Sequence, residues 1–276
     1  AANKNSTIKF DATTGKVIIN NINQLQWISQ ALNGNYELGS NIDASDTRNW
    51  NSDGSGGYYG FKQIGDQSTN NIDTRFTGNF DGKGHVIDGL YINRGSEDYV
   101  GLFGYITNSA KISNLGLTNL YIKGYRTVGG IVGENYSSII TSSYAIGDID
   151  GHMWIGGLVG HNYYSTVRNS YAKVDINGDH ISGGLVGWNV VSTIENSYAT
   201  GEVIGRNQIG GLVGFDNNAV ITNSYATGNI NALGFVGGLV GKSYHSSITN
   251  SYWDRDTTGV RNTIGLLEAD SSVDAT

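Results

Sequence analysis

The sequence predicts an all-β fold, a right-handed parallel β-helix (β-solenoid) built from 27-residue coils. A Gly-Gly-(Ile/Leu)-Val-Gly block recurs every 27 residues, beginning at Gly129, Gly156, Gly183, Gly210 and Gly237. A Ser-Tyr block keeps the same spacing, with its tyrosine at Tyr144, Tyr171, Tyr198, Tyr225 and Tyr252. No part of the repeat has an apolar stripe at helical spacing. The length fits a coil of three short strands, whereas helical repeats and propeller blades need about 33–50 residues.

Apolar positions follow the same spacing and predict the core. One column holds Ile140, Val167, Ile194, Ile221 and Ile248, and another holds Ile149, Ile176, Val203 and Ile230. If each coil pairs with the next, equivalent residues lie about 4.8 Å apart along the axis. These columns would then form internal ladders that no single coil could bury alone.

Polar positions are also periodic. Asn135, Asn162 and Asn189 form one column, and Asn169, Asn196, Asn223 and Asn250 form another. Stacked amides can hydrogen-bond to the neighbours above and below them. We expect the recurrent glycines to form tight corners with positive φ. The sequence contains no proline, as expected for strands whose backbone N–H groups all pair.

The ends of the chain depart from the repeat, so we predict that the chain has three parts. Residues 1–97 are expected to hold irregular coils, a cap and one short helix, residues 98–255 the regular coils, and residues 256–276 a cap or tail. The helix is predicted over 22–32, where Ile22, Leu25, Ile28, Ala31 and Leu32 share one face. It should cap or flank the N-terminal end, and residues 264–276 should form a capping strand or a frayed tail.

Composition and charge disfavour several classes of function. The net charge is −7 without a basic run, which disfavours a nucleic-acid partner. No apolar stretch approaches the roughly 20 residues of a membrane-spanning helix. The chain begins Ala-Ala-Asn rather than with Met, so we interpret it as a mature product or an excised fragment. We expect a monomer without a cofactor.

The Gly-Gly-Leu-Val-Gly and Asn-Ser-Tyr-Ala-Thr-Gly blocks resemble the GLUG-motif family, over roughly residues 98–255. Residues 32–45 and 76–85 look like a segment common in the same proteins. The resemblance implies a β-helical stalk or adhesive region of a large secreted bacterial surface protein. Such proteins include filamentous-haemagglutinin-like exoproteins of two-partner secretion and some immunoglobulin A proteases, in their non-catalytic region. Ser182 departs from the pattern, because Val or Ile usually precedes the Gly-Gly pair.

The sequence has no catalytic signature such as Gly-x-Ser-x-Gly or His-Glu-x-x-His. We therefore expect no catalytic residue and no metal site, with the five histidines scattered on the surface. One acidic column deserves comparison with known sites: Asp148, Asp175 and Glu202, continued by Asn229. Adjacent carboxylates could act as a glycosidase pair or bind Ca²⁺. Because the column follows the repeat, we interpret it as an outward acidic row.

The position after each glycine block breaks the repeat and is rich in aromatic residues. It runs Glu134, His161, Trp188, Phe215 and Lys242, with tyrosines nearby. We predict ligand-binding residues here: Tyr136, His161, Tyr163, Tyr164, Trp188, Phe215 and Tyr244. A second variable strip holds Tyr125, Arg126, His152, Trp154, His180, Arg206 and Phe235. Aromatic rings and amides on a flat surface suit sugar or protein contacts, and ordinary decoration of turns is the alternative.

Together these patterns predict a non-catalytic adhesin segment, secreted to the bacterial cell surface. Its partner would be a host-cell or extracellular-matrix glycan or protein, bound through the side of the rod. Two alternatives stay open. The chain could be a structural spacer of a larger exoprotein, or a β-helical enzyme that degrades polysaccharides.

Overall fold

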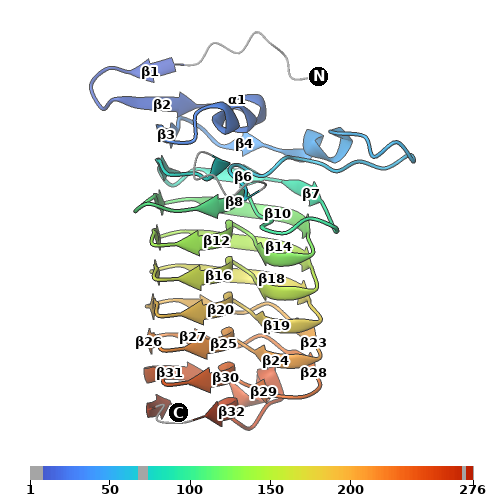
Figure 1. The fold of residues 1–276 in the computed structure, drawn as a ribbon, viewed down its shortest axis with the longest axis vertical. Coiled ribbons are helices and arrows are strands. Elements are labelled where there is room, and N and C mark those ends of the chain that lie inside the picture. The colour runs from blue at the N-terminus through green and yellow to red at the C-terminus, as the bar shows by residue number, and fades with distance from the viewer. Residues whose placement is uncertain (1–8, 68–73, 269–271, 276) are drawn as a thin grey trace.

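A computed structural model describes residues 9–67, 74–268 and 272–275. The strands stack along the long axis as a β-solenoid, from the N-terminal coil to the C-terminal coil (Figure 1). Equivalent strands of successive coils pair in parallel, for example Ile140 with Val167 and Val167 with Ile194. The 27-residue spacing of the sequence is thus the spacing of the register, and the predicted β-solenoid is confirmed.

Each regular coil contributes at least four strands rather than the three predicted. The coil after Gly157, for example, contains β16 (Val159–Tyr163), β17 (Thr166–Arg168), β18 (Tyr171–Asn177) and β19 (His180–Gly183). The last glycine of each repeated block lets two strand columns pack directly against each other. The Gly160 Cα, for instance, faces the backbone of Thr127 and Val128, where a Cβ would be 2.6 Å from both.

The strand columns form three sheets, whose members are as follows. The seven-stranded sheet holds β8 (Phe103–Ile106), β12 (Val132–Tyr136), β16, β20 (Val186–Val190), β25 (Val213–Asn217), β30 (Val240–Tyr244) and β32 (Ile264–Glu268). The five-stranded sheet holds β11 (Arg126–Gly129), β15 (Met153–Gly156), β19, β24 (Asn207–Gly210) and β29 (Val236–Gly237).

The 21-stranded sheet combines the two remaining columns of the regular coils with seven strands from the N-terminal part of the chain. One column holds β9 (Lys111–Ser113), β13 (Ile139–Thr141), β17, β21 (Thr193–Glu195), β26 (Val220–Thr222), β31 (Ser247–Trp253) and β33 (Ser272–Ala275). The other holds β10 (Gly116–Lys123), β14 (Tyr144–Asp150), β18, β22 (Tyr198–Ala199), β23 (Val203–Gly205), β27 (Tyr225–Ala226) and β28 (Ile230–Ala232). They count as one sheet because β31 pairs with both β26 and β27.

The predicted core columns are buried. Ile140, Val167, Ile194, Ile221 and Ile248 are fully shielded from solvent, and so are Ile149 and Val203 in the second column. The stack also buries an amide ladder. Asn135 donates to Asn162 (2.7 Å) and Asn162 donates to Asn189 (2.8 Å). The ladder ends one coil further than predicted, where Asn189 donates to Asp216 Oδ1 (2.7 Å).

The expected role of the repeat glycines is wrong. None of the five glycines that open the blocks has a left-handed φ; instead, each lies where a side chain would collide with backbone. A Cβ on Gly183 would be 2.2 Å from the Val186 carbonyl oxygen and 2.5 Å from the Gly214 nitrogen. Glycine is needed here for close backbone approach, which is a different use of the missing side chain.

Left-handed φ occurs instead at non-glycine residues that recur in three columns. One column turns the chain out of the seven-stranded sheet: Ser137, Tyr164, Val191, Asn218 and His245. A second precedes the Ser-Tyr blocks: Ser142, Asn169, Asn196, Asn223 and Asn250. A third lies inside the five-stranded sheet: Thr127, Trp154, Ile181 and Gln208. Asn tolerates this conformation, whereas β-branched residues adopt it only under strain.

The N-terminal part is irregular but belongs to the same stack. It holds β1 (Lys9–Asp11), β2 (Lys16–Ile19), β3 (Asn35–Leu38), β4 (Ile42–Asp43), β5 (Asn79–Asp81), β6 (Val86–Asp88) and β7 (Tyr91–Asn93). Paired residues are 19 apart between β2 and β3 (Val17, Tyr36), 44 apart between β3 and β5 (Tyr36, Phe80) and 32 apart between β5 and β9 (Phe80, Ile112). The insertion after β4 carries η2 (Ser45–Asn49) and projects sideways from the stack (Figure 1).

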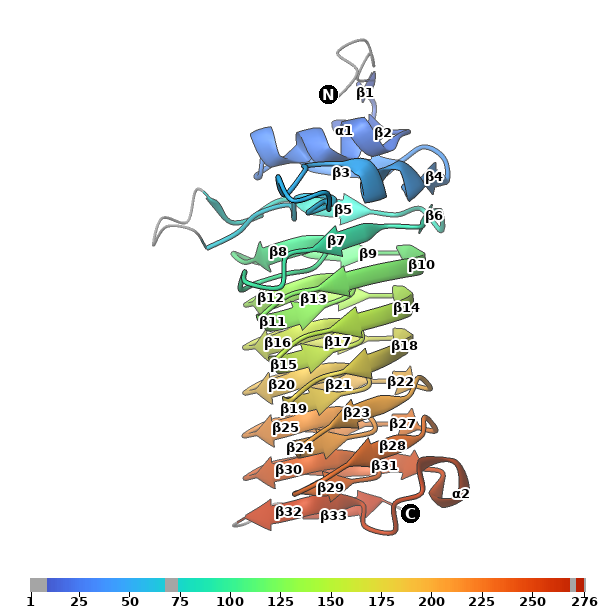
Figure 2. The same ribbon diagram turned by 90° about the vertical axis from the view of Figure 1, so that its right-hand side faces the viewer.

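The predicted helix is present but shorter. Helix α1 spans Ile22–Trp27 with Asn21 as its N-cap, and η1 continues it over Ile28–Gln30. At Ala31 φ becomes −147°, so the chain leaves the helix before Leu32 and turns toward β3. The helix lies at the N-terminal end of the rod, as predicted (Figure 2).

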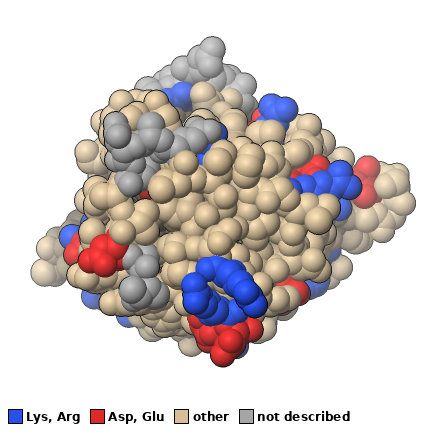
Figure 3. All heavy atoms as spheres, turned by 90° about the horizontal axis from the view of Figure 1, so that it is seen from below, with Lys and Arg blue, Asp and Glu red and all other residues tan. Residues whose placement is uncertain are grey.

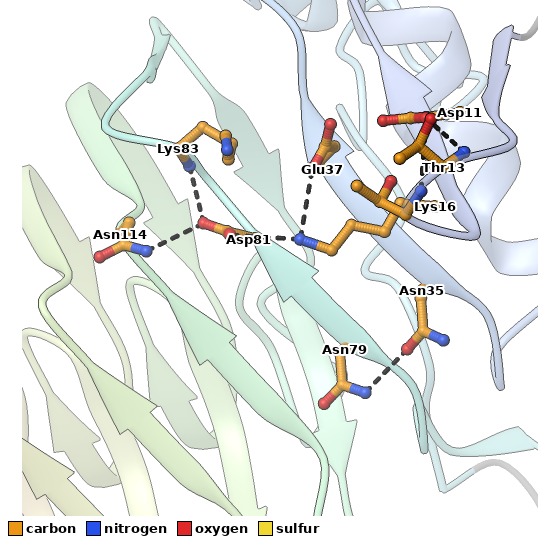
Figure 4. A network of polar contacts seen from close by, with 10 residues as sticks. Asp11, Thr13, Lys16, Asn35, Glu37, Asn79, Asp81, Lys83 and Asn114 are labelled. Atoms are coloured by element: carbon orange, nitrogen blue, oxygen red, sulfur yellow. Dashed lines mark hydrogen bonds and ion pairs between the residues drawn. The ribbon is translucent and has the colours of Figure 1, made fainter.

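A charged network joins the irregular coils, where the regular ladders are missing (Figure 4). Lys16 Nζ lies 3.2 Å from Glu37 and 3.5 Å from Asp81, and Asn114 donates to Asp81 (2.9 Å). Burial favours the neutral form of Asp81. The hydrogen bonds from Asn114 and the Lys83 N–H, together with the charge of Lys16, nevertheless hold the pKa of Asp81 below its ordinary value.

At the C-terminal end the chain forms a short helix, α2 (Arg255–Thr258), and then resumes the stack. Strand β32 pairs with β30, and β33 pairs with β31, so the described part of 264–276 consists of strands. Viewed along the axis, this end is mostly uncharged, and the charged residues lie toward its margin (Figure 3).

Candidate functional site

The aromatic residues that break the repeat come together on the seven-stranded sheet. Register pairs Glu134, His161, Trp188, Phe215 and Lys242 side by side on β12, β16, β20, β25 and β30. We call these five residues the aromatic column. The sheet holds them in line because each follows the glycine block by the same number of residues in every coil.

Contacts within the aromatic column are continuous. Glu134 Oε2 lies 2.9 Å from His161 Nδ1. The His161 ring stacks on Trp188 (centroids 4.7 Å apart, 17° between planes), and Trp188 stacks on Phe215 (5.8 Å, 6°). Lys242 Nζ lies 5.3 Å from the centre of the Phe215 ring, a cation–π distance. The ring faces meet along the axis, so the ring edges face outward.

Trp154 joins this column from the second variable strip. Its left-handed backbone (φ 60°) lies inside β15, and its ring is 5.2 Å from Trp188 and 6.1 Å from His161. Trp188 Nε1 and His161 Nε2 are both buried in this cluster, without a hydrogen-bond partner among the described residues. Neighbouring side chains therefore cover these two polar ring atoms, and the cluster presents mainly carbon atoms of its rings to the outside.

A tyrosine cluster lies beside the column. Tyr163 is 5.4 Å from Tyr136 and 4.4 Å from Tyr164, measured between ring centres. Tyr164 is 52% exposed, because its left-handed backbone turns it outward at the end of β16. A hydrogen bond with Tyr164 is the main reason why the pKa of Tyr163 is raised. The predicted residues Tyr136, Tyr163 and Tyr164 thus form one surface with His161, Trp188 and Phe215.

Tyr244 is not part of this surface. Register aligns Tyr163 with Val190, Val190 with Asn217 and Asn217 with Tyr244, so two coils without an aromatic residue at this position separate them. The Tyr244 ring instead contacts His245, with centroids 4.0 Å apart.

The column extends toward the N-terminus beyond the residues that the sequence predicted. Tyr105 pairs with Glu134, its ring lies 5.7 Å from that of Tyr99, and the Arg75 guanidinium is 4.4 Å from its centre. Burial, with the nearby Glu134 charge, raises the pKa of Tyr105 well above its ordinary value. The signal was present, because Tyr105 follows the looser block Gly101–Gly104 as His161 follows its own block.

The Ser-Tyr tyrosines form a different structure. Tyr144, Tyr171, Tyr198 and Tyr225 stack face to face at 4.8 Å with interplanar angles of 2–4°. This tyrosine ladder repeats without variation, and each inner ring covers the next. Its regularity indicates a structural role and makes it a useful comparison for the aromatic column.

The acidic column lies on the outer side of β14 and β18, as interpreted from the sequence. Asp175 Oδ1 accepts from the Glu202 N–H (2.8 Å), and Asn229 donates to Glu202 (2.6 Å). Asp148 and Asp175 are exposed. Within the described residues, no three His, Asp or Glu side chains converge as a metal site would require.

The rest of the second strip lies where the 21-stranded and five-stranded sheets meet. The Tyr125 and His152 rings stack in parallel (5.0 Å, 7°), and Arg126 lies 5.1 Å from the Tyr125 ring centre. His152, His180 and Arg206 all approach Asp179, at 3.3, 3.8 and 3.3 Å. Phe235 is 41% exposed.

The GLUG motif matches four successive coils, over residues 124–150, 152–177, 178–204 and 205–231. The halomucin of Haloquadratum walsbyi is 38% identical over 113 residues, 40% of this chain and 1% of the halomucin. A candidate Gly-rich membrane protein of Evansella cellulosilytica is 39% identical over 91 residues, 32% of this chain and 10% of that protein. The chain therefore spans a small part of the length of these relatives.

Solved structures share the fold. The crystal structure of a candidate immunoglobulin A1 protease from Bacteroides ovatus matches 87% of this chain and 75% of its own, with a TM-score of 0.70 and 22% identity. An IgA1 protease structure matches 92% of this chain and 20% of its own, with a TM-score of 0.58 and 18% identity. At these identities the likeness concerns the β-solenoid alone. No helix among the described residues is long and apolar enough to cross a membrane.

Proposed function

We propose that this chain is a non-catalytic adhesive segment of a large exported bacterial surface protein. Its aromatic column, with Trp154 and the tyrosine cluster, contacts a glycan or protein of a host cell or its matrix. The observation that carries the proposal is the unbroken contact from Glu134 to Lys242 at positions that vary from coil to coil. In a solenoid, positions with a structural role carry the same residue in every coil, as in the tyrosine ladder. A recognition surface instead needs residues that differ from coil to coil.

The chemistry of this surface supports recognition. Trp and Tyr supply rigid contact area, and the column together with the tyrosine cluster presents such rings along several coils. Trp188 and Phe215 lie near its centre, partly buried between neighbours, which is where binding energy usually concentrates.

Surface location is supported by the named relatives, a halomucin and a candidate membrane protein, and by their great length relative to this chain. The filamentous-haemagglutinin-like type of exoprotein is part of the same proposal. A spacer role is the second candidate, favoured by the regularity of the coils from Gly124 to Tyr252. The enzyme alternative is weaker, because two carboxylates of the acidic column already accept hydrogen bonds within the rod, Asp175 from the Glu202 N–H and Glu202 from Asn229.

Paired substitutions test the proposal. Trp188→Ala with Phe215→Ala should weaken saturable binding to a glycan array or to epithelial cells by roughly 30-fold, since central aromatic residues contribute about 2 kcal/mol or more. Tyr171→Ala with Tyr198→Ala removes two rings from the ladder and serves as the matched control, which should bind normally. Binding unchanged in the Trp188/Phe215 variant, or release of soluble sugar by the wild type, would overturn the proposal.

A further inference from the structure

A pocket lies at the N-terminal end of the rod, between the helical segment α1–η1 and the insertion that separates β4 from β5. Its volume is about 620 Å³, within the range of small-molecule sites, about 300–1,000 Å³. Paired residues of β3 and β5 are 44 apart, against 27 in the regular coils, and the insertion holds the additional residues (Figure 1). The pocket therefore forms where the chain departs most from the repeat.

Amide side chains make up much of the pocket lining. Gln26 and Gln30 come from α1 and η1, and Asn49, Asn51 and Gln63 come from the insertion. An amide carries N–H donors and a carbonyl acceptor side by side. Hydroxyl groups also both donate and accept, so this lining matches a ligand rich in hydroxyls.

Hydrogen bonds hold the pocket in shape. Gln26 joins its two sides, because Oε1 accepts from the Lys62 N–H (2.9 Å) and Nε2 donates to the Lys62 carbonyl oxygen (2.8 Å). Glu97 accepts from Gln63 Nε2 (3.1 Å) and from Arg94 Nη1 (2.8 Å). Gln63 and Arg94 are 4% and 8% exposed, so they form a fixed polar floor. A pocket held in this way loses little conformational freedom when a ligand binds.

Trp50 supplies an aromatic wall. Its ring lies against the fully buried Phe61 (centroids 6.4 Å apart, 25° between planes), which fixes it from the core side. Within the described part of the chain, Phe61 is the only aromatic neighbour of Trp50. The rings of the aromatic column, in contrast, are stacked on one another. The Trp50 ring therefore offers the pocket a rigid apolar surface.

The charges of the pocket balance. Lys62 and Asp66 both belong to its lining, and the Arg94 guanidinium is paired with Glu97 (2.8 Å). The two cationic and two acidic side chains leave no net charge to select an anionic or a cationic ligand. A ligand that fits the pocket is therefore polar but neutral.

From these observations we infer that the pocket binds a neutral saccharide. The apolar C–H face of one sugar ring packs against Trp50, and the exposed amides of Gln30 and Asn49 bond to its hydroxyls from opposite sides. Arg94, at the floor, donates to a sugar oxygen. The inference goes beyond the proposed function, because the pocket shares no residue with the aromatic column or the tyrosine cluster.

Saturation-transfer NMR of the purified chain tests the inference. The probes are glucose, galactose, mannose, N-acetylglucosamine, maltose, cellobiose and lactose, and the comparison probes are galacturonate, glucosamine and diglycine. At least one neutral saccharide should bind saturably, and more tightly than any comparison probe. Trp50→Ala should weaken that binding by about tenfold or more, because a Trp ring supplies a large part of the contact area. Trp27→Ala is the matched control, since Trp27 lies in α1, is 43% exposed and does not line the pocket.

Further variants keep the test decisive if Trp50→Ala disturbs the fold. Gln30→Ala with Asn49→Ala removes two exposed amides and should weaken binding by about threefold or more, the effect of losing a typical hydrogen bond or two. Asn33→Ala, at an exposed position outside the lining, should bind normally.

The column variant separates this inference from the proposed function. Trp188→Ala with Phe215→Ala should bind the saccharide as the wild type does, so the two proposals can fail independently. Absence of saturable binding by every neutral saccharide, tighter binding of galacturonate, or an equal loss in Trp27→Ala would overturn the inference.

Discussion

Asp216 occupies the last position of the buried amide ladder, where the preceding coils have Asn. Burial raises its pKa to about 7 from an ordinary value of 3.8, although hydrogen bonds with Asn189 and Ser246 oppose the shift. The folded chain therefore holds this proton more tightly than the unfolded chain does. Its contribution to stability is fully present below pH 3.8 and is lost as the pH rises to about 7.

Asp216→Asn should remove this pH dependence. At pH 8 the variant should be more stable than the wild type by a few kcal/mol, on the order of the cost of ionising a buried carboxyl, while below pH 4 the two should be similar. Urea unfolding at several pH values measures the difference. Asp148→Asn, at an exposed position, is the control. A stability difference that does not vary with pH would contradict the explanation.

Val191 shows strain at a single corner. Its φ is 47°, in a column where the next coil has Asn218 at 50°. A β-branched side chain is disfavoured in this region, whereas Asn tolerates it. Val191 is also 42% exposed, so little burial would be lost on substitution.

Val191→Asn should therefore stabilise the fold by about 1 kcal/mol. The matched control is Val220→Asn, because Val220 is 41% exposed but lies in β26. It should lose stability, since Asn is disfavoured in strands. Thermal unfolding of both variants decides the point, and a loss at Val191 similar to that at Val220 would count against the corner explanation.

At the scale of the strand, the glycines of the block allow backbones to approach closely, both between successive coils and between the seven-stranded and five-stranded sheets. The sequence located these glycines in every coil, but spacing alone could not separate two uses of glycine, a left-handed φ and the absence of a Cβ. The structure assigns the second use to the block glycines and gives the left-handed positions to residues such as Asn196 and Trp154. Spacing alone also could not show that the Trp154 ring contacts Trp188 from the neighbouring sheet, so the sequence placed the two residues in different strips.

Gly183→Ala should destabilise the rod by about 3 kcal/mol or more, because backbone atoms on two coils would have to separate. Gly95→Ala is the control: there a Cβ would meet only the flexible end of Lys123, at 3.2 Å. Its effect should be within about 1 kcal/mol, the ordinary range for a surface substitution. Equal effects of the two substitutions in chemical unfolding would contradict the assigned role of the block glycine.

At the scale of the whole molecule, periodicity predicted the stack, its register and the buried columns, because repeated spacing fixes which residues become neighbours. The N-terminal coils could not be predicted in this way, since their spacings of 19, 44 and 32 residues occur once each. For the same reason, only part of the candidate site could be predicted from the sequence. Positions after the blocks gave the aromatic column, whereas Tyr105 lies 29 residues before its partner Glu134 and so falls outside the 27-residue spacing.

The proposed function assigns adhesion to the aromatic column and not to the rod as such. The most direct measurement is the binding isotherm of labelled wild type, the Trp188/Phe215 alanine variant and the Tyr171/Tyr198 alanine variant on intact epithelial cells. We expect saturable binding of the wild type and the ladder variant, and binding weakened by roughly 30-fold for the column variant. Equal isotherms for all three proteins, or no binding by any of them, would contradict it and favour the spacer.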